Sequence, residues 1–120
     1  LDNSNVSSPS DMVGLLGMLY RDDILSSSSR HAALDILGRQ QHNTIIPHYL
    51  PPGTKTAHKT GGVTGVRCDV GIVYAPSGSY TVALMAREVA DRSKIDRQLA
   101  GVSRALYEHF EGSTMASGFV

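Results

Sequence analysis

The sequence predicts an α+β fold in which two helices precede three antiparallel strands and a C-terminal helix packs on the sheet. Three observations support this order. Apolar residues recur at helical spacing before residue 40, run almost without interruption in short segments between residues 67 and 87, and return to helical spacing after residue 92. Because short connections join the three strands, we expect them to pair as antiparallel neighbours.

Two helices are expected in the first third of the chain. Ser8 and Asp11 form a capping box, which is typical of a helix start. The apolar spacing that follows predicts a helix over residues 9–20, and a second pattern predicts a helix over about 29–40. We interpret the four serines at 26–29 as a loop that ends in a helix cap, rather than as a set of nucleophiles.

A proline-containing loop separates the second helix from the strands. Pro47, Pro51 and Pro52 exclude a long regular element there. We expect the loop to be anchored by burial of its apolar side chains, which are Ile45, Ile46, Tyr49 and Leu50.

The rest of the chain is expected to form the sheet and one more helix. The predicted strands cover about 54–60, 67–75 and 80–87. Asp91 is a suitable cap for a helix over about 92–110. An apolar stripe on that helix should face the sheet, and it consists of Ile95, Leu99, Val102, Leu106 and Phe110. Residues 112–120 are small and polar until the last two, which is typical of a disordered tail.

Composition gives little indication of a macromolecular partner. Eleven basic and eleven acidic residues cancel, so the charge favours neither a nucleic acid nor an anionic membrane. No apolar run is long enough to span a bilayer. Cys68 is the single cysteine, and the five histidines lack metal-ligand spacing. We therefore expect no nucleic acid, membrane, metal or cofactor to bind.

One segment stands out for function. Residues 54–62 alternate like a strand and end in Lys59-Thr60-Gly61, followed by Gly62. This triplet matches the K-T-G element of class A β-lactamases and penicillin-binding proteins. In that chemistry a strand supplies an ammonium group, a hydroxyl and a backbone N–H to the developing oxyanion. Taken alone, the triplet is better explained by a solvated strand lysine and an ordinary glycine bulge or turn.

Several other segments match the same family in order and spacing. They are Asn5–Met12, Ile46–Gly53, Ala57–Gly61 and Arg67–Val73. Over about residues 5–110 the chain therefore resembles the C-terminal part of a class A β-lactamase or penicillin-binding-protein-like serine hydrolase. The resemblance implies that residues 1–53 belong to the helical subdomain and residues 54–111 form the C-terminal half of the α/β subdomain, with a tail over 112–120.

The resemblance also implies roles for individual residues. Lys59 would contribute charge to proton transfer, and the backbone N–H of Gly62 would be one donor of the oxyanion hole. Thr60, Gly61 and Arg67 would bind substrate, with Thr60 and Arg67 directed at its carboxylate. Periplasmic or secreted localisation is typical of the family, although no signal-peptide pattern heads this chain.

The motifs that carry the family's nucleophile are absent from the sequence. No serine stands three residues before Lys55, Lys59 or Lys94, so there is no S-x-x-K motif, and there is no Ser-x-Asn either. The family's deacylating glutamate lies upstream of the matched region. Because covalent catalysis requires an activated nucleophile, we expect the isolated chain to be inactive and its status as an enzyme to depend on a missing part.

Three interpretations remain open at this stage. The chain supplies one wall of a cleft for a β-lactam-like small molecule and pairs with a complementary N-terminal half that carries the nucleophile, or else it self-associates, for example as a domain-swapped dimer. Alternatively it is a non-catalytic binding or interaction module of this fold, or part of a related esterase or peptidase.

The first interpretation carries a structural expectation. A three-stranded sheet leaves two open edges. Without the earlier part of the fold, the helical stripe over 9–20 should be exposed, together with the sheet faces around Val70, Ile72, Val82 and Leu84.

Overall fold

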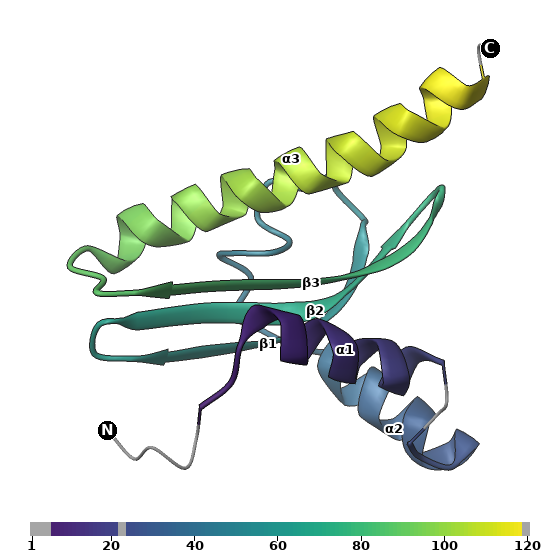
Figure 1. The fold of residues 1–120 in the computed structure, drawn as a ribbon, viewed down its shortest axis with the longest axis horizontal. Helices are drawn as coiled ribbons and strands as arrows, with labels where there is room; N and C mark the ends of the chain where they lie inside the picture. Colours follow the sequence, from purple (N-terminus) through teal and green to yellow (C-terminus); the bar gives the residue numbers. More distant parts are fainter. Residues whose placement is uncertain (1–5, 22–23, 119–120) are drawn as a thin grey trace.

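The predicted order of elements is confirmed in the computed structural model, which describes residues 6–21 and 24–118 (Figure 1). The elements are α1 (Pro9–Tyr20), α2 (Ser27–Gly38), β1 (Lys55–Val63), β2 (Val66–Ala75), β3 (Gly78–Arg87) and α3 (Arg92–Gly118). The strands form one antiparallel sheet in the order β1-β2-β3. In Figure 1, α3 lies on one side of the sheet, and α1 and α2 lie on the other.

Short polar side chains fix where the helices begin. The backbone N–H of Asp11 donates to Ser8 Oγ at 3.1 Å, as the capping box predicts. Asp91 likewise accepts from the N–H of Lys94 at 3.1 Å. The cap of α2 is Ser26, whose Oγ accepts from the N–H of Ser29 at 3.2 Å, so this helix begins two residues earlier than expected.

The last helix is longer than the sequence predicts. It continues to Gly118, about two turns beyond the expected end near residue 110. The tail expected over 112–120 is therefore helical as far as 118, and residues 119–120 lie outside the described part of the chain. Gly112 weakens the helix without ending it, because no proline follows it directly, and the helix continues to the next glycine, Gly118. Among the described residues, no helix is both long enough and apolar enough to cross a membrane.

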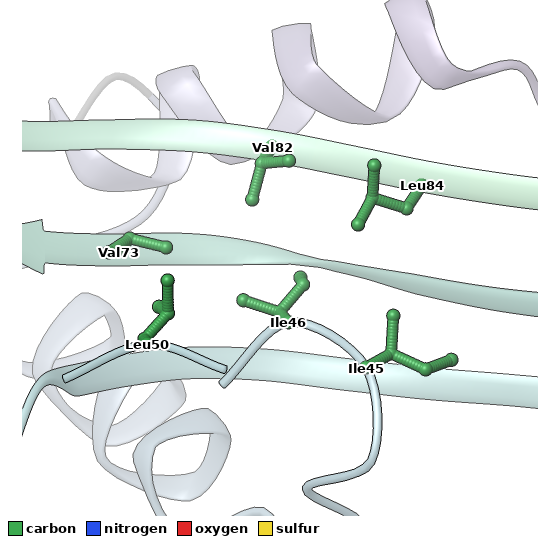
Figure 2. Packing of buried hydrophobic residues seen from close by; sticks show 6 residues of the cluster. All are labelled: Ile45, Ile46, Leu50, Val73, Val82 and Leu84. Atoms are coloured by element: carbon green, nitrogen blue, oxygen red, sulfur yellow. The ribbon is translucent and has the colours of Figure 1, made fainter. Parts of the chain in front are cut away.

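The main hydrophobic core lies between the sheet, the loop before β1, and α3. Figure 2 shows the apolar side chains of this loop meeting those of β2 and β3; the cluster comprises Ile45, Ile46, Leu50, Val73, Val82 and Leu84. The predicted anchoring of the loop is thus confirmed for three of its four apolar residues. Tyr49 is the exception, since it is 43% exposed and its ring packs against His48 at the surface.

The expectation that the sheet faces are exposed is wrong. The four side chains named for them are all buried, with 8% of Val70, 0% of Ile72, 5% of Val82 and 7% of Leu84 exposed. Val82 and Leu84 pack under the loop before β1. Successive strand residues point to opposite faces, which places Val70 and Ile72 toward α1 and α2.

The apolar stripe of α3 is rotated from its expected position. Val102 and Phe110 are largely exposed, whereas Asp96, Ala100 and Ser103 are buried. Ser103 Oγ donates to the carbonyl oxygen of Ile46 at 2.8 Å. Polar contacts to the loop and sheet therefore help to determine which side of α3 faces inward.

Candidate functional site

A cleft of about 560 Å³ lies between β1, the start of β2, the loop before β1 and the first turns of α3. It is lined by every site residue that the sequence predicts, namely Lys59, Thr60, Gly61, Gly62 and Arg67. The structure therefore brings the predicted residues together. The remaining lining residues were not singled out from the sequence, and they are His42, Thr44, Arg92, Ser93 and Asp96.

The Lys-Thr-Gly segment lies on an edge strand. In the described part of the chain, β1 pairs only with β2, so its outer side has no strand partner. An edge strand offers free backbone N–H groups, which an oxyanion site requires. Lys59 is exposed, and its Nζ donates to the carbonyl oxygen of Thr60 at 2.6 Å. Thr60 itself is 8% exposed at the cleft wall.

Arg67 lies in the cleft but is held by an acidic residue of the chain itself. Its Nε and Nη2 donate to the two carboxylate oxygens of Asp96 at 2.8 and 2.7 Å. Thr44 Oγ1 adds a third hydrogen bond to Asp96 Oδ2 at 3.0 Å. The two charged side chains are only 12% and 13% exposed, so this bidentate pair is well shielded from water.

The pair shifts the pKa of both partners. The hydrogen bond from Arg67 lowers the pKa of Asp96, and the bond from Thr44 acts in the same direction. The hydrogen bond to Asp96 raises the pKa of Arg67. Asp96 therefore stays ionised and Arg67 stays protonated near neutral pH.

Gly62 is placed where no other residue would fit without rearrangement. A Cβ at this position would lie 3.3 Å from Arg92 Nη2 and closer still to the Arg67 guanidinium. The absence of a side chain thus lets two guanidinium groups lie against the strand. With three cations (Lys59, Arg67, Arg92) and one carboxylate (Asp96), the formal charge of the lining is +2 with His42 neutral. Such a cleft favours anionic ligands.

A buried polar network is centred on His58, the residue that immediately precedes the triplet in β1. His58 Nδ1 hydrogen-bonds Asp69 Oδ1 at 2.8 Å, and His58 Nε2 hydrogen-bonds Asn43 Oδ1 at 3.0 Å. His58 is 1% exposed and Asp69 0%. The second oxygen of Asp69 accepts from the N–H of Ile46 at 2.9 Å, so the network ties β1 and β2 to the loop. The sequence analysis did not single out this network. Asp69 was the signal that could have found it, because a charged residue inside the apolar run of β2 needs a buried partner.

Comparison with known proteins places this chain in a family. The chain belongs to the β-lactamase enzyme family, whose model matches residues 2–110. A search of curated proteins gives no match.

Solved structures extend this result. A mutant of PBP-A in an acyl-enzyme complex with penicillin G is 36% identical with a TM-score of 0.83, and the match covers 88% of this chain and 40% of that one. A β-lactamase from Sphaerobacter thermophilus DSM 20745 is 29% identical with a TM-score of 0.80, covering 85% and 40%. The TLA-1 extended-spectrum β-lactamase, at 24% identity and a TM-score of 0.80 over 87% and 41%, shares the fold. The chain thus spans about 40% of the length of these relatives and corresponds to the later part of their fold.

Proposed function

We propose that the chain is the C-terminal portion of a serine β-lactamase-type hydrolase, in which an acyl-enzyme forms from a β-lactam amide and is then hydrolysed. The observation that carries this proposal is that the predicted site residues line one cleft. Residues predicted from one strand motif and its neighbouring strand line a single, positively charged cavity beside an edge strand. Membership of the β-lactamase family and the acyl-enzyme complex of PBP-A with penicillin G support the same chemistry.

Each cleft residue has a role in this proposal. Lys59 contributes an ammonium group to the proton-transfer network of the nucleophile. Thr60 donates its hydroxyl to the substrate carboxylate, and Gly61 lets the substrate approach the strand. The N–H of Gly62 stabilises the developing oxyanion, a contribution for which loss of one donor typically lowers kcat by about 10²- to 10³-fold. Arg67 supports the anionic part of the substrate, either directly or by holding Asp96.

The nucleophile must come from a complementary segment, because this chain has no S-x-x-K motif. The surface around α1 and α2 supports such a partner. It exposes large apolar side chains that a folded protein usually covers: Leu15, Met18, Tyr20, Ile24, Leu25 and Ile36, each at least 40% exposed. We call these six residues the α1–α2 apolar face. The complementary N-terminal half would cover this face, and in its absence a self-associated or swapped dimer would do so.

The test is reconstitution. The chain is co-expressed with the part of PBP-A that precedes the matched region, and labelling by a fluorescent penicillin is followed on denaturing gels. The C-terminal part of PBP-A, supplied in place of this chain, shows that the split arrangement can assemble. We expect labelling of the mixed complex, loss of most labelling with Lys59→Ala, and none when the chain is incubated alone.

Two results would contradict the proposal. One is nitrocefin hydrolysis by the isolated chain that Lys59→Ala abolishes. The other is an assembled mixed complex that is never labelled although the PBP-A control is; this outcome would favour a non-catalytic module.

A further inference from the structure

A buried carboxylate lies directly across the strand pair from the threonine of the Lys-Thr-Gly segment. The antiparallel register pairs Thr60 with Asp69, and the next pair on the same face is His58 with Gly71. Residues directly opposite each other have Cβ atoms about 4.5–5.5 Å apart, so their side chains are neighbours. We propose that His58 is a positioning residue, which keeps the Asp69 carboxylate occupied and thereby leaves the Thr60 hydroxyl available to the substrate. This inference rests on the proposed function, in which Thr60 donates to the substrate.

Both oxygens of Asp69 are occupied by donors other than Thr60. Oδ1 is hydrogen-bonded to His58 Nδ1 at 2.8 Å, and Oδ2 accepts from the N–H of Ile46 at 2.9 Å. Because Asp69 is 0% exposed, solvent cannot replace a lost donor, and a buried carboxylate without a partner is strongly unfavourable. If the imidazole were removed, the side-chain donor directly opposite in the register would be the Thr60 hydroxyl. Asp69 would then compete with the substrate for that hydroxyl.

The position of the imidazole is fixed from several directions. His58 is 1% exposed, and its Nε2 is hydrogen-bonded to Asn43 Oδ1 at 3.0 Å. Gln40 Nε2 donates to the carbonyl oxygen of His58 at 3.4 Å. Opposite His58, a Cβ on Gly71 would lie 2.5 Å from the His58 Cβ and closer still to the carbonyl oxygen of Ala57. The missing side chain of Gly71 thus makes room for the histidine beside Asp69.

This role differs from packing in what can replace the histidine. If His58 only filled space, the charge of Asp69 would not matter to the cleft. If it keeps Asp69 occupied, a donor at the position of Nδ1 is essential. An asparagine places its amide nitrogen near the position of Nδ1, whereas a glutamine places its amide near that of Nε2. His58→Asn should therefore preserve the role and His58→Gln should lose it.

The first test uses NMR on the chain as it stands. In the ¹⁵N-labelled wild type, we expect a proton on His58 Nδ1 that exchanges slowly with solvent, unlike the ring protons of His109, an exposed histidine of α3. In His58→Gln, the hydroxyl proton of Thr60 should become slow to exchange, because Asp69 binds it. It should stay fast in wild type and in His58→Asn. An unprotonated Nδ1 in wild type, or a Thr60 hydroxyl proton that does not respond to His58→Gln, would overturn the proposal.

The second test measures acylation of the reconstituted complex by benzylpenicillin. We expect His58→Gln to raise the concentration for half-maximal acylation about 10- to 100-fold, the effect of losing one hydrogen bond to a charged group, with the limiting rate unchanged. Adding Asp69→Asn to this variant should restore the wild-type value, because no unpaired carboxylate then competes for the hydroxyl. His109→Asn is the matched control and should have no effect.

The outcomes separate the two proposals. If the double variant is as impaired as His58→Gln, or if the limiting rate falls instead, the assignment is refuted. Should His58→Gln fail to fold, the double variant and His58→Asn decide, since both should keep the wild-type half-maximal concentration even where the Tm is lower. If the wild-type complex is never acylated, the proposed function fails, and the hydroxyl exchange of Thr60 still decides whether His58 keeps Asp69 occupied.

Discussion

The layers that cover the two faces of the sheet differ in how completely their own apolar side chains are buried. On the face toward α3, Ile45, Ile46 and Val73 are all 0% exposed. On the opposite face, α1 has one buried residue, Leu16, and α2 has none. One layer is therefore a finished hydrophobic core, whereas the other is covered by helices whose own outer sides remain apolar and exposed. The difference supports our proposal that a complementary segment covers the α1–α2 apolar face.

Hydrogen bonds explain why the finished layer does not need further support. The loop residue Ile46 has its N–H bound to Asp69 Oδ2 at 2.9 Å and its carbonyl oxygen bound to Ser103 Oγ at 2.8 Å. These bonds fix an irregular segment between β2 and α3 with its backbone satisfied. Thr44 directly precedes Ile45 and Ile46 of this core, so the loop that brings Thr44 Oγ1 to Asp96 in the cleft is positioned by the core itself.

The largest expected effect on stability comes from truncating a buried side chain in the core between the sheet and α3. Ile46→Ala should lower the free energy of unfolding by about 2–5 kcal/mol, because it leaves a cavity between the loop and the sheet. The matched control, Ile36→Ala, removes the same atoms from a side chain that is 63% exposed and should change stability by less than about 0.5 kcal/mol. Urea denaturation measures both. Equal effects of the two variants would contradict the distinction between the faces.

A smaller effect is expected from acid, and it also belongs to the finished layer. Because Arg67 lowers the pKa of Asp96, the folded state binds fewer protons than the unfolded state at low pH. The stabilisation is fully present above the unfolded pKa, about 3.9, and is lost as the pH falls through the lower folded pKa. Urea unfolding at pH 7, 4 and 3 should therefore show a shallower loss of stability for Asp96→Asn than for wild type. Parallel pH profiles would show that the pair makes no such contribution.

The sequence predicts the order of elements well, because apolar periodicity and helix caps are local signals. It also predicts the cleft residues of β1 and β2, since they belong to one recognisable motif. It does not predict Thr44, Arg92 or Asp96, which reach the cleft from a loop and a helix far away in the sequence. Asp96 in particular has the pattern of a solvated helix residue, and only the fold shows that it meets Arg67.

The buried positions of α3 were missed for a related reason. Ser103 and Asp96 face inward because each has a polar partner on the loop or the sheet, and hydrophobic periodicity cannot detect such partners. The extension of α3 past Gly112 shows the other limit, since one glycine is a weak stop signal without a proline or a cap behind it.

The smallest effect on stability is expected for substitutions on the α1–α2 apolar face. These substitutions also give the sharpest test of the difference between the two layers. Leu15 is 48% exposed in this chain, so Leu15→Glu should change the free energy of unfolding of the isolated chain by less than about 0.5 kcal/mol. In an assembly that buries this face, the same substitution places a carboxylate in an apolar contact and should weaken association strongly. The control is Ser10→Glu, which adds the same charge to an exposed polar position of α1.

Sedimentation velocity at micromolar concentration distinguishes these outcomes. Wild type and Ser10→Glu should sediment as an associated species, or bind the N-terminal part of PBP-A, while Leu15→Glu should shift toward monomer. The reason is that the α1–α2 apolar face gathers six apolar side chains that are each at least 40% exposed, whereas the core on the opposite side of the sheet is already closed. If all three proteins sediment as compact monomers and none binds the PBP-A segment, the exposed side chains of α1 and α2 are simply solvated. The chain would then be an independent module rather than half of a divided enzyme.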